Sequence, residues 1–198
     1  MLDSYARRIV QPAISGGAKL LKGAGLSANT VSWLAMLLGV GSSAVWMAGY
    51  PAAAVAVLWI SGYLDAVDGT IARMTKPSKW GNILDITFDR VVEGTIMAAI
   101  LIMYPEHILP LGLILAAILV NVTAFLVAGN VISNSGVKGF HYNPGILERT
   151  EAFVFFSLLM LLPSMVAVIA WIFLVLLLFT TIKHLRDVYV WLEENSPD

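Results

Sequence analysis

The chain has 198 residues, of which 59% are hydrophobic and 13% are charged, and its mean hydropathy is +0.82. Soluble domains carry about 25% charged residues, so the composition excludes an ordinary soluble domain and indicates a single integral membrane domain over residues 1–198. The net charge of −1 excludes the basic footprint of a nucleic-acid-binding protein, and the lack of cysteine excludes disulfides and thiolate metal sites.

Residues 2–22 are predicted to form an amphipathic helix that lies in the membrane interface, within an interfacial segment at 1–25. An approximate apolar stripe is accompanied by four basic residues. The stripe consists of Leu2, Tyr5, Ile9, Ala13 and Leu20, and the basic residues are Arg7, Arg8, Lys19 and Lys22. A helix on the solvent side is the alternative. This start lacks the continuous apolar region and the small-residue cleavage site of a signal peptide, so we do not expect one.

Six membrane-spanning helices are predicted over residues 26–191, which makes the fold class an all-α membrane bundle. Each helix is close to the roughly 20 residues that a bilayer requires. The expected ranges are 26–49, 52–73, 81–103, 108–132, 147–162 and 165–191, followed by a short acidic tail at 192–198. Ser27 or Asn29 is expected to cap the first helix. The fifth helix is short, so its neighbours or loop residues must complete its passage.

The basic residues predict the orientation of the bundle. All twelve lysines and arginines fall in the N-terminal segment, in the region where spans two and three meet, in the region where spans four and five meet, or at the C-terminal end. The three opposite turns have none. By the positive-inside rule, both termini then lie on the cytoplasmic side of the cell membrane. The aspartates described next lie on the same side, where a nucleotide-activated substrate would be available.

Four aspartates within 25 residues are the main functional signal: Asp65, Asp68, Asp85 and Asp89. Ionisable residues in membrane helices are costly and usually functional. Spacings of three and four place each pair on one face of its helix. Because carboxylates that converge repel one another, we expect divalent cations between them, and oxygen ligands favour Mg²⁺ or Mn²⁺. Helix capping or interhelical ion pairing is the alternative.

An acidic site of this kind in a membrane predicts phosphoryl displacement on a lipid diphosphate. Two divalent ions roughly 3.5–4 Å apart can neutralise a diphosphate and stabilise the attacking and leaving oxygens. Gly69 and Ala72 lie on the helix face that carries the first aspartate pair, and Gly81 lies on the face that carries the second. Small residues at these positions would let a ligand or a neighbouring helix come close.

The spacing D-x2-D-G-x2-A-R-x7-G-x3-D-x3-D, from Asp65 to Asp89, resembles the signature of the CDP-alcohol phosphatidyltransferase family. Eight defined positions match: Asp65, Asp68, Gly69, Ala72, Arg73, Gly81, Asp85 and Asp89. The family usually has eight or nine residues between the arginine and the second glycine, whereas this chain has seven. The turn between the second and third spans is therefore expected to be short.

The resemblance implies transfer of a phosphatidyl group from a CDP-linked lipid to a small alcohol, with release of CMP. It implies that Asp65, Asp68, Asp85 and Asp89 bind two Mg²⁺ or Mn²⁺ ions, and that Asp89 is also the general base. The implied CDP-binding residues are Asp65, Asp68, Gly69, Ala72, Arg73 and Gly81. The alternatives are that Arg73 only reaches the interface and that the glycines only serve packing. The resemblance also implies a homodimer.

The acceptor pocket is predicted from the remaining basic residues on the cytoplasmic side. Arg90, Lys138 and Arg149 could bind a phosphorylated alcohol, since arginine binds phosphate in a bidentate manner. The alternative is that Arg90 and Arg149 only pair with Glu93 and Glu148. The Asp-Arg sequence at 89–90 and the basic N-terminal segment look more like the family's inositol-phosphate-using branch than its serine-using branch. Glycerol 3-phosphate and serine remain alternative acceptors.

The three histidines and two alternative functions remain to be interpreted. His141 could face an acceptor, whereas His107 and His184 are expected to be interfacial residues without a function in the site. A divalent-cation transporter is an alternative of another class, although the carboxylates gather at one end of their helices. A scaffold that has lost activity is the last alternative, and the seven-residue spacer is its only support.

Overall fold

The computed structural model describes residues 2–134, 147 and 149–195, with side chains at 10–132, 147 and 149–194. All regular structure in these residues is helical. The elements are α1 (Leu2–Gly23), α2 (Ala28–Met47), α3 (Pro51–Met74), α4 (Lys79–Met103), η1 (Pro105–His107), α5 (Ile108–Asn134), α6 (Arg149–Leu161), η2 (Pro163–Met165) and α7 (Val166–Asn195). The predicted all-α class is confirmed.

Local caps set two of the helix starts that matter for the site. Of the two candidate caps of α2, Ser27 is the cap, because its Oγ accepts a hydrogen bond from the Thr30 N–H at 3.1 Å. Ser78 caps α4 in the same way through the Gly81 N–H at 2.9 Å, so α4 begins two residues earlier than expected. At the other end of the chain, α7 continues to Asn195 and includes the first four residues of the expected tail.

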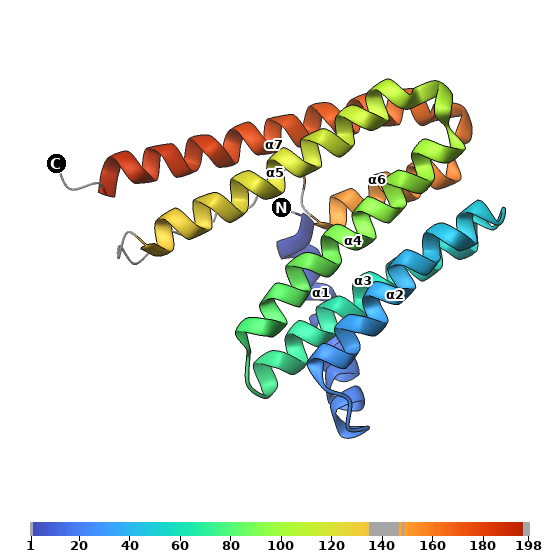
Figure 1. The fold of residues 1–198 in the computed structure, drawn as a ribbon. Coiled ribbons are helices and arrows are strands. Elements are labelled where there is room, and N and C mark those ends of the chain that lie inside the picture. The colour runs from blue at the N-terminus through green and yellow to red at the C-terminus, as the bar shows by residue number, and fades with distance from the viewer. Residues whose placement is uncertain (1, 135–146, 148, 196–198) are drawn as a thin grey trace.

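The helices form two groups that α6 joins. α2, α3 and α4 lie side by side, and α5 lies along α7 (Figure 1). α6 contacts α3 and α4 as well as α7. Figure 1 shows the two groups meeting near η1 and η2 and diverging from there, so that the ribbon opens like a V. One of the two cavities discussed below lies within the first group, between α2, α3 and α4, and the other lies between α4, α6 and the second group.

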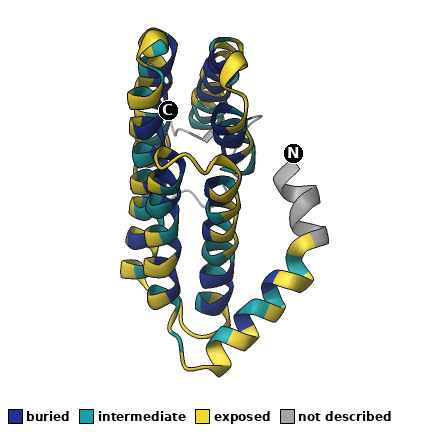
Figure 2. Ribbon diagram, turned by 90° about the vertical axis from the view of Figure 1, so that its right-hand side faces the viewer, coloured by how far each residue is buried: buried dark blue, intermediate teal, exposed yellow. Residues whose placement is uncertain are grey.

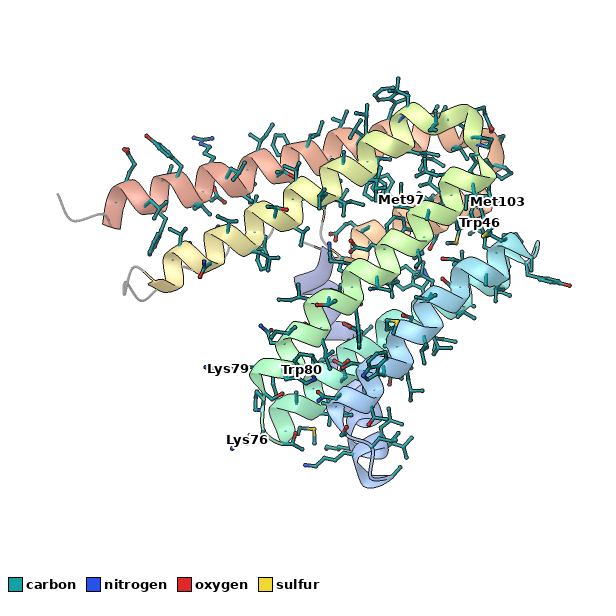
Figure 3. The ribbon with its side chains drawn as sticks, in the orientation of Figure 1. Trp46, Lys76, Lys79, Trp80, Met97 and Met103 are labelled. Atoms are coloured by element: carbon teal, nitrogen blue, oxygen red, sulfur yellow. The ribbon has the colours of Figure 1, made fainter. Side chains whose placement is uncertain are left out.

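The largest apolar core holds the two groups together near their junction. Its fully buried members include Leu58, Ile96, Ile100, Leu111, Ile114, Phe156 and Phe173. Trp46 is also buried there and donates a hydrogen bond from Nε1 to the Met160 carbonyl at 3.2 Å. Figure 3 shows Trp46 and Met103 at this end of the molecule and Lys76, Lys79 and Trp80 at the opposite end of α3 and α4. The packing therefore leaves the polar ends of α3 and α4 free to form a site.

α1 stands at an angle to the bundle and contacts it along one face (Figure 2). Ile14 and Ala18 are buried against α3, and the Tyr63 hydroxyl donates to the Ala13 carbonyl at 3.0 Å. Leu20 and the Ala13 side chain, members of the predicted stripe, are exposed instead. α1 therefore has one face against the protein and a second, exposed face with apolar residues.

Four helical stretches are long and apolar enough to cross a membrane. They are Ala28–Met47, Pro51–Met74, Pro105–Ile132 and Pro163–Glu194. α4 has 25 residues but carries the charges of Lys79, Asp85, Asp89, Arg90 and Glu93. α6 has only 13 residues, which span about 20 Å at 1.5 Å per residue, less than the roughly 30 Å of a hydrocarbon core. By length and composition, then, the described residues provide four of the six expected spans.

We expect Gly39→Ala to lower the free energy of unfolding by about 1–3 kcal/mol through overpacking. A Cβ at Gly39 would lie 2.5 Å from Val92 Cγ2 and 2.9 Å from Ser61 Oγ. Gly41→Ala is the matched control, because nothing lies within 4 Å of its added Cβ and alanine favours a helix. Thermal unfolding in detergent measures both variants. Equal midpoints for the two would show that the contact among α2, α3 and α4 is looser than described.

Candidate active site

Three of the four predicted carboxylates converge between α3 and α4. Asp65, Asp68 and Asp85 each offer an oxygen, and these atoms all lie within 4.8 Å of one another. Asp68 is only 4% exposed, and its Oδ2 has no hydrogen-bond partner among the described residues. A buried carboxylate oxygen without a partner is costly. This donor set, oxygen-only and surplus in negative charge, fits a hard divalent cation.

Asp89 lies outside this group, one helical turn beyond Asp85 on α4. It is linked to the group by Arg149, the first residue of α6. One guanidinium nitrogen of Arg149 contacts Asp65 Oδ2, and the other lies 2.8 Å from Asp89 Oδ1. A single cation from α6 therefore bridges carboxylates from α3 and α4. Sequence analysis expected Arg149 in an acceptor pocket but did not predict these two contacts.

A cavity of about 240 Å³ opens beside the carboxylates between α2, α3 and α4. Asp68 and Asp85 line it together with four residues of the matching motif, Gly69, Ala72, Arg73 and Gly81. Asp65, the remaining predicted CDP-binding residue, is absent from its described lining. The seven-residue spacer does not separate the helix ends, because α3 ends at Met74 and α4 begins at Lys79. Six of the eight motif positions, all but Asp65 and Asp89, therefore line one cavity.

The other polar residues of this cavity were missed by sequence analysis. They are Asn29, Ser32, Lys76, Ser78 and Asn82. Asn29 was considered only as a helix cap, and since Ser27 takes that role, the Asn29 side chain is available to the cavity. A Cβ at Gly81 would lie 3.3 Å from Asn29 Oδ1, so the glycine allows α2 and α4 to approach closely here. Arg73 lies along α3, where its Nη2 donates to Thr70 Oγ1 at 2.9 Å.

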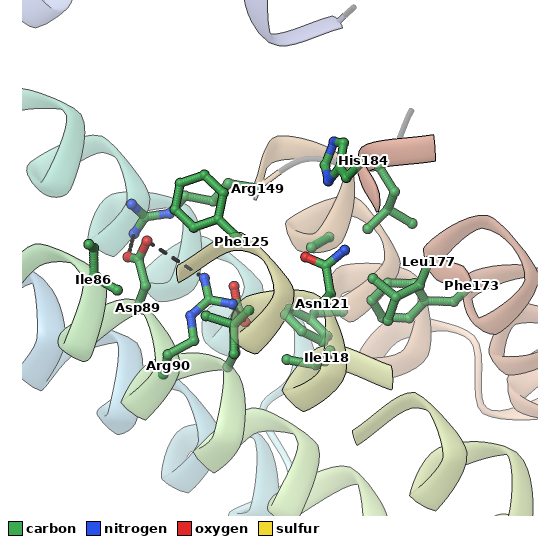
Figure 4. Close-up of a pocket in the computed structure, with 15 residues that line it drawn as sticks. Ile86, Asp89, Arg90, Ile118, Asn121, Phe125, Arg149, Phe173, Leu177 and His184 are labelled. Atoms are coloured by element: carbon green, nitrogen blue, oxygen red, sulfur yellow. Dashed lines mark ion pairs between the residues drawn. The ribbon is translucent and has the colours of Figure 1, made fainter. Parts of the chain in front are cut away.

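A second cavity, of about 390 Å³, lies between α4, α5, α6 and α7 (Figure 4). Its size is in the usual range for small-molecule sites, about 300–1,000 Å³. Charged residues line one side: Asp89, Arg90, Glu93 and Arg149. Arg90 Nη1 lies 2.7 Å from Glu93 Oε2, and Arg90 Nη2 lies 3.8 Å from Asp89. The structure thus places two of the three predicted acceptor residues, Arg90 and Arg149, around one cavity.

Three residues predicted near the acceptor, Lys138, His141 and Glu148, lie outside the described residues. Two other residues that line this cavity were not predicted to belong to the site. His184, which was expected to lie at the interface without a function, lines the cavity from α7, and Asn121 lines it from α5. An amide inside the otherwise apolar stretch 108–122 was the signal that could have indicated Asn121.

The position of Arg149 is fixed from α7 as well as from the carboxylates. Thr180 Oγ1 accepts a hydrogen bond from the Leu147 N–H at 3.1 Å and donates one to the Leu176 carbonyl at 2.8 Å. Leu147 is only two residues before Arg149. The Arg149 guanidinium also lies 5.6 Å from the centre of the Phe153 ring, close enough for a cation–π contact. Thr180 on α7, which is buried, thus helps to position Arg149 at the start of α6.

Comparisons with known proteins agree with this geometry. The sequence model of the CDP-alcohol phosphatidyltransferase family matches residues 26–183. The chain is 28% identical to the inner membrane protein YnjF of Escherichia coli strain K12, over 98% of both chains. It is 29% identical to the phosphatidylinositol phosphate synthase of Corynebacterium glutamicum, over 78% of this chain and 71% of that one.

Solved structures show the same fold. The Mycobacterium tuberculosis phosphatidylinositol phosphate synthase PgsA1, with CDP-DAG bound, superposes with a TM-score of 0.74. It is 21% identical and covers 89% of this chain and 93% of that one. The same protein in complex with manganese and citrate gives a TM-score of 0.73.

Proposed function

The chain belongs to the CDP-alcohol phosphatidyltransferase family, and we propose that it transfers a phosphatidyl group from CDP-diacylglycerol to inositol phosphate, releasing CMP. One observation carries this proposal. Asp68 and Asp85 line the cavity between α2, α3 and α4, whereas Asp89, one turn further along α4, lines the cavity that contains Arg149. A CDP-linked lipid in the first cavity would therefore meet an alcohol in the second cavity at one row of carboxylates.

The carboxylates are proposed to hold two Mg²⁺ or Mn²⁺ ions, with Asp65, Asp68 and Asp85 as ligands and Asp89 as an additional ligand. A relative with this fold has been solved in complex with manganese. When bound, such ions would neutralise the diphosphate and stabilise charge on the leaving oxygen. The orphaned Asp68 Oδ2 and the crowding of the three carboxylates support this assignment.

The residues of the chain would then act on the two substrates separately. Arg73 and the small residues Gly69, Ala72 and Gly81 would accommodate the CDP group. Asp89 would take the proton of the acceptor hydroxyl as general base. The hydroxyl oxygen forms a bond to the phosphorus that carries diacylglycerol, the bond from that phosphorus to CMP breaks, and CMP leaves.

The choice of a phosphorylated acceptor rests on the two arginines in the second cavity. Arg149 and Arg90 line the same wall, and Lys138 is proposed to complete the pocket. Curated relatives from Corynebacterium glutamicum and Streptomyces avermitilis are phosphatidylinositol phosphate synthases. Inositol phosphate is therefore the favoured acceptor, with glycerol 3-phosphate and serine as the alternatives that an acceptor screen separates.

We further propose that the enzyme is a homodimer of six-span subunits in the inner membrane, with both termini and the active site cytoplasmic. In this arrangement α4 and α6 also cross the membrane, which brings the four apolar spans to six, and the charged residues of α4 and α6 face the site. The exposed apolar residues Val10 and Leu20 on α1, beside Lys19 and Lys22, support an interfacial position for that helix. The inner membrane location of the Escherichia coli relative supports the compartment.

The proposed reaction predicts that chelation of divalent ions lowers CMP release by at least about 100-fold, since the ions contribute several kcal/mol of charge stabilisation. Purified protein is given CDP-diacylglycerol with inositol phosphate, glycerol 3-phosphate, serine or inositol in turn. CMP release is measured with Mg²⁺, with Mn²⁺ and with EDTA. Re-addition of the metal should restore the rate. Release that survives EDTA, or that occurs equally without any acceptor, would contradict the proposal.

A further inference from the structure

The wall of the second cavity opposite the arginines carries an unexplained amide. Asn121 lies within Pro105–Ile132, which is apolar enough to cross a membrane, and it lines the cavity. A polar side chain at such a position is costly unless it has partners or a function. Asn121 Nδ2 donates a hydrogen bond to Thr181 Oγ1 on α7 at 2.8 Å. This contact satisfies the amide nitrogen but leaves the amide oxygen to be explained.

The hydrogen-bond network fixes which way the amide points. The Thr181 hydroxyl donates its single proton to the Leu177 carbonyl at 2.9 Å, so it can only accept a bond from Asn121. With this pairing the nitrogen of Asn121 faces α7 and its oxygen faces away from Thr181. Figure 4 shows the consequence, with the Asn121 nitrogen toward Leu177 and Phe173 and its oxygen toward the side of Arg90 and Asp89.

We propose that Asn121 determines acceptor specificity by accepting a hydrogen bond from one hydroxyl of the polyol, and that Thr181 is the residue that positions it. This inference rests on the proposed function, which places the acceptor in this cavity. The arginine wall would bind the phosphate of the acceptor, Asp89 would face the hydroxyl that reacts, and Asn121 would bind a hydroxyl that does not react. A site built to hydrogen-bond a hydroxyl discriminates against analogues that lack it, because the accepting oxygen is then left unpaired in the complex.

The test combines Asn121→Leu with a series of inositol phosphate analogues that each lack one hydroxyl. We expect Asn121→Leu to raise the KM for inositol phosphate about three- to tenfold, the loss of one hydrogen bond, with the KM for CDP-diacylglycerol unchanged. The wild type should have a raised KM for at least one deoxy analogue, and Asn121→Leu should no longer distinguish that analogue from the parent compound. Thr181→Val should weaken the same discrimination. Thr181→Ser keeps the hydroxyl and should discriminate as the wild type does.

Thr123→Val is the matched control, because Thr123 is an exposed residue on α5 whose hydroxyl donates a hydrogen bond within its own helix, to the Leu119 carbonyl at 2.7 Å. If Asn121 merely holds α5 to α7, then Asn121→Leu and Thr181→Val will lower the thermal midpoint while acceptor KM and analogue preference stay at wild-type values, which overturns the inference. Should Asn121→Leu fail to fold, the wild-type analogue series and the two Thr181 variants decide the question. A wild type that uses none of the phosphorylated polyols refutes the proposed function itself.

Discussion

Replacing Asp89 with asparagine is expected to lower the kcat for CMP release by about 10²–10⁴-fold, the usual contribution of a general base. Asparagine has nearly the same size and retains an oxygen for Arg149, which lies 2.8 Å from Asp89 Oδ1. It cannot take a proton from the acceptor hydroxyl. Because Asp89 lines the acceptor cavity rather than the cavity between α2, α3 and α4, the KM for CDP-diacylglycerol should change little.

Two comparisons make this result specific to Asp89. Asp187→Asn, on α7 near Lys183 and outside both cavities, should retain the wild-type rate. Asp85→Asn should weaken Mn²⁺ binding measured by calorimetry more than Asp89→Asn does, since Asp85 belongs to the converging group of three. A wild-type kcat in Asp89→Asn would exclude the general-base role. A loss of Mn²⁺ binding equal to that of Asp85→Asn would instead make Asp89 chiefly a metal ligand.

The parts of the site that the sequence predicted are those governed by the period of a helix. Asp65 and Asp68 share a face with Gly69 and Ala72, so the regular geometry of α3 places them together whatever its neighbours do. The same holds for Gly81 and Asp85 on α4. Since a connection of only four residues joins the two helices, their ends had to lie side by side. The cavity between α2, α3 and α4 is therefore lined by six of the eight motif positions, all but Asp65 and Asp89.

The parts that could not be predicted depend on contacts between distant helices. Arg149 reaches Asp65 across 84 positions of sequence, and no local pattern encodes the crossing angle that makes this possible. Asn121 and Thr181 meet across 60 positions for the same reason. The apolar stripe of α1 was ambiguous because lipid and protein both favour apolar side chains, so Leu20 could face either. In the structure it is exposed.

Removal of the Arg149 guanidinium is expected to cause the second large loss. In Arg149→Ala, Asp65 and Asp89 lose the cation that contacts both of them. Truncating one partner of a buried, hydrogen-bonded charge pair costs about 2–5 kcal/mol, which corresponds to a fall of roughly 30- to 4,000-fold in kcat/KM. We expect this fall for phosphorylated acceptors, measured as CMP release at saturating CDP-diacylglycerol. Arg186→Ala, an exposed arginine on α7, is the control and should keep the wild-type value.

Arg149→Lys separates charge from geometry at the same position. A lysine ammonium keeps the positive charge, but it is a compact point charge, whereas the planar guanidinium of Arg149 directs one nitrogen at Asp65 and the other at Asp89. The lysine variant should therefore recover only a small part of the rate lost in Arg149→Ala. Full recovery would mean that charge alone matters.

If both variants instead lose Mn²⁺ binding and use every acceptor equally poorly, Arg149 serves to organise the carboxylates and the acceptor phosphate must be bound elsewhere. A selective loss for phosphorylated acceptors, with Mn²⁺ affinity retained, would place that phosphate beside Arg149.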